Sequence, residues 1–349
     1  MKRSARMKQR GFTIVEIMVA MAIGLVVAAV VVTMFAASSR SYRVTDAMGD
    51  LQESGRIAMA TLQRDAHVVG FRGCNSNNVR SSAPITNIQA TPTAYLNDFI
   101  TGVQGYEGGG GGWTPAPFPT AISAPGVPVA AGPTALTDVL VLRVAVGTPV
   151  ALSANMANAT ADLPMMSVAG FADGTRAIVA DCQRATVFQV TGANAGTLTL
   201  QHGLGVGVGS NTSASAQRAY GIDASVMRFE THAYFVGPSI RDPANERSLW
   251  VRVDGNAPVE VVENVEDMQV LYGEDTDADY VPNLFRRADT VVTWANVVAI
   301  QVSLLLRGSG LRDNQAITNY VYNGTTTVPV DRRLRRTYTA TIQLRNRTL

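Results

Sequence analysis

The sequence predicts an α+β protein in which one long N-terminal helix, apolar in its first half, packs through its second half on an antiparallel β-sheet head. The first observation is an almost unbroken apolar run from Phe12 to Ala37. The second is the absence of proline before Pro84, which leaves no strong stop signal for a helix. The third is the dominance of strand-like segments from Leu136 onward.

The N-terminal apolar run has the length and composition of a membrane-spanning helix. Residues 1–11 are short, polar and basic, and Glu16 is the only charged residue between Phe12 and Ala37. Helical geometry gives this run a length of about 39 Å, more than the roughly 30 Å hydrocarbon core of a bilayer. Basic residues before the run favour a cytoplasmic N-terminus, so we predict a single pass at 12–38 through the inner membrane and a periplasmic head.

The charge of the chain is concentrated before this run. The formal net charge is +2, and removing the five positive charges of residues 1–11 would change it to −3. Net charge therefore gives no support for binding to nucleic acid, which we do not expect as a partner.

The next segment, 39–69, is predicted to continue the helix as an amphipathic half. Its apolar residues recur at spacings of three and four, which predicts one face packed on a domain. Residues 70–135 are rich in Pro, Ser, Thr and Gly and predict an irregular region. Its aromatic residues are expected to anchor it to the domain, with a contact surface as the alternative. The helical face comprises Leu51, Gly55, Ala58, Met59, Leu62, Ala66 and Val69, and the aromatic residues are Tyr95, Tyr106, Trp113 and Phe118.

The remainder, 136–349, is predicted to form a β-rich globular head. Its apolar and β-branched segments have strand length and are separated by turn residues. The run 297–306 is too short for a second membrane span and contains Gln301 and Ser303, so we interpret it as a core strand. The predicted strands are 139–146, 176–180, 186–190, 197–201, 226–236, 249–253, 268–272, 298–306 and 338–344.

The chain has two cysteines, Cys74 and Cys182, both beyond the predicted membrane span. Two cysteines in an exported domain favour one disulfide. The alternatives are two buried free thiols and, less favoured because no histidine lies near either cysteine in sequence, a metal pair.

Enzymatic sites are not indicated by the sequence. His67, His202 and His232 are scattered without zinc spacing, and no G-x-S-x-G motif occurs. We therefore predict no catalytic residues, no cofactor and no metal. The weak exception is Asp275, Asp277 and Asp279, which alternate as calcium ligands can, against a solvated acidic turn as the alternative. Tyr280 and Arg286 replace the glycine and glutamate of an EF-hand loop.

A basic cluster lies near the C-terminus. It consists of Arg332, Arg333, Arg335, Arg336, Arg345 and Arg347. Since these residues lie in and beside a predicted strand, paired surface charges or a subunit interface are favoured over binding to DNA or an acidic partner.

The run Gly11-Phe12-Thr13-Ile14-Val15-Glu16 resembles the type IV prepilin signature. The resemblance implies that prepilin peptidase cuts after Gly11 and that the new N-terminal residue, Phe12, is N-methylated. A carboxylate in a membrane helix is unfavourable by roughly 2.5–3.5 kcal/mol, so Glu16 needs a partner. We expect the charged Phe12 amine of a neighbouring subunit to be that partner and to set the register of assembly. The alternative is an uncleaved anchor with Glu16 near the headgroups.

Further segments resemble the PilW family of type IV pilus minor pilins, and the fold expected is pilin-like. The resemblance implies a subunit that primes pilus assembly in a tip complex with other minor pilins and the major pilin, served by the inner-membrane assembly platform. It also implies support of adhesion and twitching motility. A weaker similarity to J-type pseudopilins leaves a type II secretion pseudopilin as one alternative, and a tip adhesin or DNA-binding module as another. The matching segments are 51–56, 64–65, 70–74, 181–182, 185–190, 262–273, 332–338 and 344–347.

Overall fold

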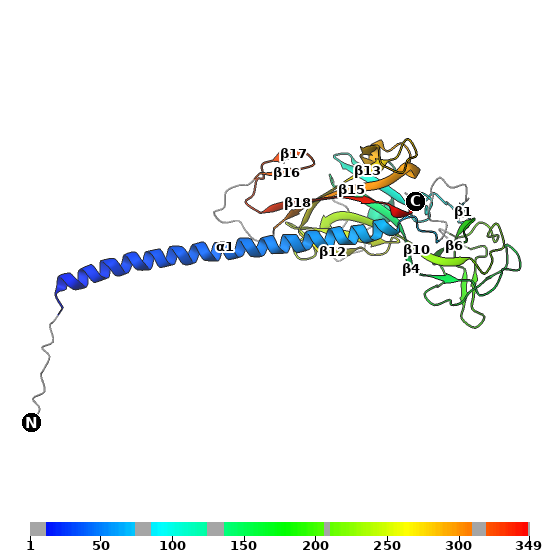
Figure 1. The fold of residues 1–349 in the computed structure, drawn as a ribbon, viewed down its shortest axis with the longest axis horizontal. Coiled ribbons are helices and arrows are strands. Elements are labelled where there is room, and N and C mark those ends of the chain that lie inside the picture. The colour runs from blue at the N-terminus through cyan, green and yellow to red at the C-terminus, as the bar shows by residue number, and fades with distance from the viewer. Residues whose placement is uncertain (1–11, 74–84, 124–135, 206–209, 309–318, 348–349) are drawn as a thin grey trace, which may run out of the picture. The chain divides into compact units, whose positions relative to one another are not determined.

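The computed structural model describes residues 12–73, 85–123, 136–205, 210–308 and 319–347. They belong to two compact units, Met1–Asp50 and Leu51–Leu349. Helix α1 (Ile14–Val68) begins in the first unit and ends in the second (Figure 1). The helix followed by a mostly β head confirms the predicted pilin-like α+β class.

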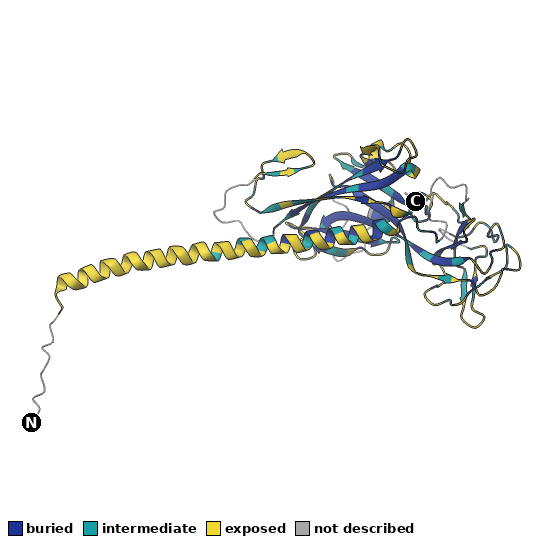
Figure 2. Ribbon diagram, viewed as in Figure 1, coloured by how far each residue is buried: buried dark blue, intermediate teal, exposed yellow. Residues whose placement is uncertain are grey.

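The helix of the first unit is exposed along nearly its whole length (Figure 2), and its large apolar side chains are exposed from Phe12 to Phe35. Phe12 is 83% exposed and Phe35 is 77% exposed. The helix is long and apolar enough to cross a membrane. So much exposed apolar surface is stable only in lipid or against other apolar helices.

The largest sheet of the second unit is built around one long strand, β10 (Ser225–Pro238). Along one edge β10 pairs with β4 (Val139–Ala151), while β6 and β11 share its other edge. The strand order is β1-β7-β6-β10-β4-β2-β3, with β11 and β12 continuing from β10. All pairs in this sheet are antiparallel except β1 with β7. The other strands are β1 (Ile85–Asn87), β2 (Val103–Gly109), β3 (Gly112–Thr114), β6 (Arg176–Ala180), β7 (Ala185–Gln189), β11 (Arg247–Val253) and β12 (Val259–Glu263).

A second, four-stranded antiparallel sheet has the order β14-β13-β15-β18. A three-stranded sheet, β5-β9-β8, and the hairpin β16-β17 complete the described strands. Strand bounds are β5 (Leu163–Pro164), β8 (Gly192–Asn194), β9 (Thr199–Gln201), β13 (Val265–Glu274), β14 (Leu284–Arg286), β15 (Val297–Arg307), β16 (Tyr320–Tyr322), β17 (Thr325–Thr327) and β18 (Arg335–Gln343). The short helices are α2 (Thr120–Ser123), η1 (Ala288–Thr290), η2 (Trp294–Asn296) and η3 (Arg345–Arg347).

The nine predicted strands all coincide with observed strands, most of them longer than expected. The region 70–135 differs from the irregular expectation, because it contains β1, β2, β3 and α2. Gly105 weakens the strand signal of β2 in the sequence, since glycine disfavours strands. A Cβ atom on Gly105 would overlap the Tyr272 hydroxyl group, so the glycine leaves room for that ring.

The predicted helical face is buried in the second unit. Leu51, Ala58, Leu62 and Ala66 have no exposed surface and belong to the largest core cluster, together with residues of β4, β10, β13 and β15. Gly55 allows the ring of Tyr338 on β18 to approach the helix, because a Cβ there would lie 2.5 Å from two ring carbons. The Tyr338 hydroxyl also donates to the Leu51 carbonyl at 3.3 Å.

The aromatic residues of the 70–135 region anchor it, as expected. Tyr106 is buried in a cluster with Val141 and Trp250, and Phe118 stacks on Trp113. The Trp113 indole nitrogen donates to the Thr137 carbonyl at 3.0 Å. This cluster lies on one face of strands β4 and β10, whose alternate residues belong to the core that includes α1.

Candidate functional site

The N-terminus of α1 contains a capping box formed by Thr13 and Glu16. The Glu16 carboxylate accepts from the Thr13 backbone N–H at 3.1 Å and from the Thr13 hydroxyl at 3.2 Å. In return, the Glu16 backbone N–H donates to the Thr13 hydroxyl at 3.3 Å. A threonine at the N-cap and a glutamate three residues later accept hydrogen bonds from two backbone N–H groups that have no partner within the helix.

This arrangement gives Glu16 a partner within its own chain. The sequence signal for this capping box is Thr-x-x-Glu before an apolar run, and it is independent of the membrane interpretation of Glu16. Glu16 and Phe12 are both exposed, so both remain accessible to a neighbouring subunit. Gly11 lies outside the described residues, and cleavage there stays a prediction.

A buried polar cluster lies where the end of α1 packs against β10. Asp65 is 4% exposed, and its Oδ2 atom is 2.6 Å from His232 Nδ1 and 2.5 Å from the Tyr234 hydroxyl. On the other side of the imidazole, His232 Nε2 lies 3.2 Å from Glu230 Oε2. Arg64 donates to the second Asp65 oxygen at 3.1 Å. The cluster joins residues that are 167 positions apart in the sequence.

Hydrogen bonds and charges set the protonation of this cluster. Burial alone would lower the pKa of His232, but hydrogen bonds to Asp65 and Glu230 and their negative charges raise it to about 9. Burial alone would raise the pKa of Asp65, but hydrogen bonds from His232, Tyr234 and Arg64 hold it below its usual value. His232 is therefore an imidazolium at neutral pH, and the cluster fastens the helix to the sheet.

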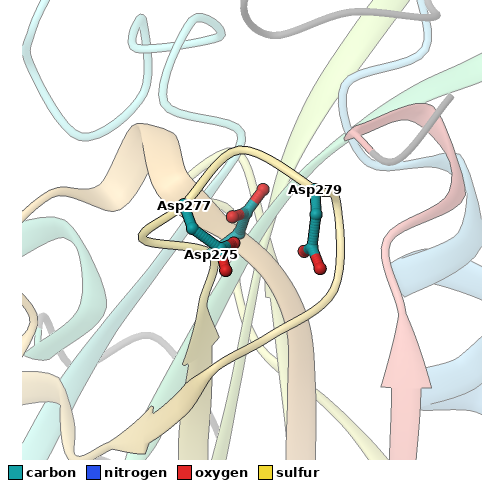
Figure 3. A group of neighbouring side chains, drawn as sticks. All are labelled: Asp275, Asp277 and Asp279. Atoms are coloured by element: carbon teal, nitrogen blue, oxygen red, sulfur yellow. The ribbon is translucent and has the colours of Figure 1, made fainter.

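The three predicted calcium candidates lie together on the loop between β13 and β14 (Figure 3). One carboxylate oxygen from each of Asp275, Asp277 and Asp279 lies within 4.8 Å of the others. Asp275 is buried and accepts from the backbone N–H groups of Ala278 at 2.7 Å and Tyr280 at 2.9 Å.

Hydrogen bonds within the loop also involve the two exposed carboxylates. Asp277 accepts from the Asn283 amide at 3.1 Å, and Asp279 accepts from the Val281 backbone N–H at 2.8 Å. Arg286, in the place of the EF-hand glutamate, forms an ion pair with Glu274 at 2.8 Å. The loop is therefore closed by its own contacts, and calcium binding stays an open prediction.

The predicted cysteine pair is only partly within the described residues. Cys182 lies between β6 and β7, whereas Cys74 lies outside the described residues. The disulfide stays a prediction.

Two of the six C-terminal arginines, Arg333 and Arg335, are held by acidic side chains, as the paired-charge interpretation expects. Arg335 forms ion pairs with Glu266 at 2.7 Å and Asp331 at 2.5 Å, and Arg333 pairs with Glu246 at 2.5 Å. Arg347 is buried. These contacts leave little support for a DNA-binding surface at this end of the chain.

Comparison with known proteins found a family match in each of the two units. Residues 6–32 match the prokaryotic N-terminal methylation motif, and residues 233–346 match the family described as type IV pilus-assembly protein W. The chain thus contains a prepilin methylation motif and a PilW-family segment, which together cover less than half of its length. The PilW match runs from the second half of β10 to η3 and includes the whole four-stranded sheet.

A curated pilin-like protein is also similar to part of the chain. The chain is 46% identical over 70 residues to the pilin-like protein PilA3 of Thermus thermophilus. That match covers 20% of this chain and 30% of the relative. No solved structure matches the chain.

Proposed function

We propose that this chain is a PilW-type minor pilin that primes assembly of a type IV pilus. In this proposal its N-terminal helix holds it in the inner membrane, with the head in the periplasm, until prepilin peptidase cleaves after Gly11. The chain then joins other minor pilins and the major pilin near the pilus tip through the assembly platform. Its role is structural rather than enzymatic, and it supports twitching motility and adhesion through the pilus.

The observation that carries this proposal is the exposed apolar helix of the first unit behind a methylation motif. A helix of this kind can be covered by lipid before assembly and by neighbouring helices after it. The same surface thus suits both the membrane-bound and the assembled states.

Processing is tested by replacing Gly11 in the full chain. We expect Gly11→Trp to remain at its unprocessed length in membranes of a strain that carries prepilin peptidase. Gly24→Ala is the matched control, because a Cβ at Gly24 meets nothing within 4 Å. Normal shortening of the Gly11 variant would contradict cleavage at this position.

The role of Glu16 is tested by separating its charge from its capping contact. Glu16→Gln keeps an oxygen that can accept from the Thr13 N–H but removes the charge, whereas Thr13→Val keeps the charge and removes the hydroxyl. If the charge binds the Phe12 amine of a neighbour, Glu16→Gln will be processed but poorly incorporated into sheared pili, and Thr13→Val will be incorporated. The opposite pattern would assign Glu16 to capping alone.

Priming itself is tested by deleting the gene for the chain and counting surface pili by electron microscopy. We expect pili to be lost and to return when the wild-type chain is supplied. A deletion strain with normal pili but reduced attachment would indicate a tip adhesin instead.

A further inference from the structure

A cavity of about 510 Å³ lies between the four-stranded sheet and the hairpin β16-β17, whose strands are labelled in Figure 1. This volume is within the roughly 300–1,000 Å³ range of small-molecule sites. The sheet residues that line it alternate with core residues such as Val302, so the cavity lies on the face of the sheet opposite the main core.

The floor of the cavity is polar and uncharged. Gln269, Ser303 and Thr339 are paired in register across β13, β15 and β18, and Gln301 occupies the next row. The Ser303 and Thr339 hydroxyls are 3.1 Å apart, and Gln301 donates one N–H to the neighbouring Thr341 hydroxyl at 3.2 Å. Within the described residues this leaves the Gln301 carbonyl oxygen and its second N–H for a ligand.

One wall of the cavity contains a buried acceptor without a partner. Glu107 at the end of β2 is 9% exposed, and its Oε1 atom is 3.3 Å from Arg287 Nε. Its Oε2 atom is buried and has no hydrogen-bond partner among the described residues. Burial raises the pKa of Glu107, although Arg287 and the Ala288 backbone N–H oppose the rise. Because Oε2 is covered, the carboxylate must turn toward the cavity before a ligand hydroxyl can donate to this oxygen and remove its unfavourable state.

The charges around the cavity exclude two ligand classes. Among the described lining residues Arg287 is the only cation, and it already pairs with Asp289 at 2.6 Å and with Glu107, so an anion has no available counter-charge. Asp138 accepts with both oxygens from backbone N–H groups, of Gly108 at 3.0 Å and Val270 at 2.8 Å. A metal ion would find too few remaining carboxylate oxygens.

We propose that this cavity binds a neutral saccharide. Hydroxyl groups of a sugar can donate to Glu107 and can both donate to and accept from the amides and hydroxyls of the floor. Tyr322 of β16 lines the cavity and is fixed by donating its hydroxyl to the Ser303 carbonyl at 3.1 Å, which provides an aromatic ring for the apolar face of a sugar. The inference does not depend on the proposed priming role.

The test uses the full chain, purified in a detergent without a sugar headgroup so that detergent cannot compete. Labelled protein is applied to a printed array of neutral mono- and disaccharides, sialylated and sulfated sugars, and polyamines. We expect binding to neutral saccharides, and the strongest of them is then titrated by isothermal calorimetry. An array on which nothing binds, or on which only anionic sugars or polyamines bind, would overturn the proposal.

Three variants connect the binding to this cavity. Glu107→Gln removes a charged acceptor and should raise the Kd by about tenfold or more, and Thr339→Val should raise it by about fivefold. Thr326→Val is the matched control: Thr326 lies on β17, is exposed and is outside the cavity lining, so its replacement should leave the Kd within about twofold. Near-ultraviolet circular dichroism confirms that each variant is folded. A folded Glu107→Gln variant with unchanged affinity would refute the assignment, even if a sugar binds elsewhere.

Discussion

Replacing His232 by glutamine should destabilise the second unit strongly at pH 6 and weakly above pH 9. His232 contacts Asp65 and Glu230, and these carboxylates raise its pKa from 6.5 to about 9 despite burial. Because the folded pKa lies above the unfolded value, the stabilisation is complete below pH 6.5 and is lost as the pH rises toward 9. A rise of this size corresponds to about 3 kcal/mol at pH 6 and about 2 kcal/mol at pH 7.5, shared among the three side chains.

Asp65 contributes in the opposite direction. Its folded pKa lies below the usual value, so its stabilisation is present above pH 3.8 and is lost as the pH falls through the folded value. The cluster is therefore most stabilising between these two limits. The Asp65 and His232 contributions cannot be added, because they describe one ion pair from its two sides.

The assay is urea unfolding of the full chain in detergent micelles at pH 6, 7.5 and 9.5, followed by tryptophan fluorescence. Trp250 is fully buried in the second unit and reports its unfolding. His67→Gln is the matched control: burial and Arg345 lower the pKa of His67, so its replacement should produce no loss that fades at high pH. A His232→Gln loss that is equal at all three pH values, or a His232 resonance that titrates near pH 6.5 by NMR, would refute the reasoning.

Three further predictions concern packing, the acidic loop and the cysteines. Gly55→Ala should lower the free energy of unfolding by about 1–3 kcal/mol although alanine favours helices, because the new Cβ would overlap the Tyr338 ring. Gly49→Ala is the control and should cause no such loss, because a Cβ there meets nothing within 4 Å. Equal urea midpoints for the Gly55→Ala variant and the wild type would contradict the prediction. Added calcium should leave the Tm unchanged, whereas a rise that Asp277→Ala abolishes would establish a calcium site. Mass spectrometry without reductant should find Cys74 linked to Cys182, with reduction costing about 4–5 kcal/mol; two alkylated thiols would disprove the link.

The helix and the strands were predictable because their signals are local. The apolar run, the lack of early proline and the β-branched segments each determine structure over a few neighbouring residues. β2 was not predicted because its glycines weaken the strand signal, and the reason for Gly105 lies in the distant Tyr272 ring. Such a contact between distant segments leaves no periodic pattern in the sequence.

The functional sites also differ in whether their sequence signals are local. The methylation motif and the Thr13–Glu16 capping box are short motifs that the sequence alone contains. The Asp65–His232 pair joins α1 to β10, and the proposed saccharide cavity brings together residues from several strands, so the sequence does not name these partners. The spacing of the three histidines carries no information about the partner of His232, because Asp65 lies 167 residues away in the sequence.

The capping box also changes what assembly requires of Glu16. A carboxylate with no partner in lipid would be unfavourable by roughly 2.5–3.5 kcal/mol, but donors from Thr13 satisfy it within the monomer. The Thr13 contacts are already charge-assisted through the carboxylate, and in the proposed pilus the neighbour's Phe12 amine adds an opposite charge as partner. Glu16 would then exchange a neutral partner for a charged one on incorporation. A subunit could thus remain in the membrane without penalty until cleavage supplies the charge that favours assembly.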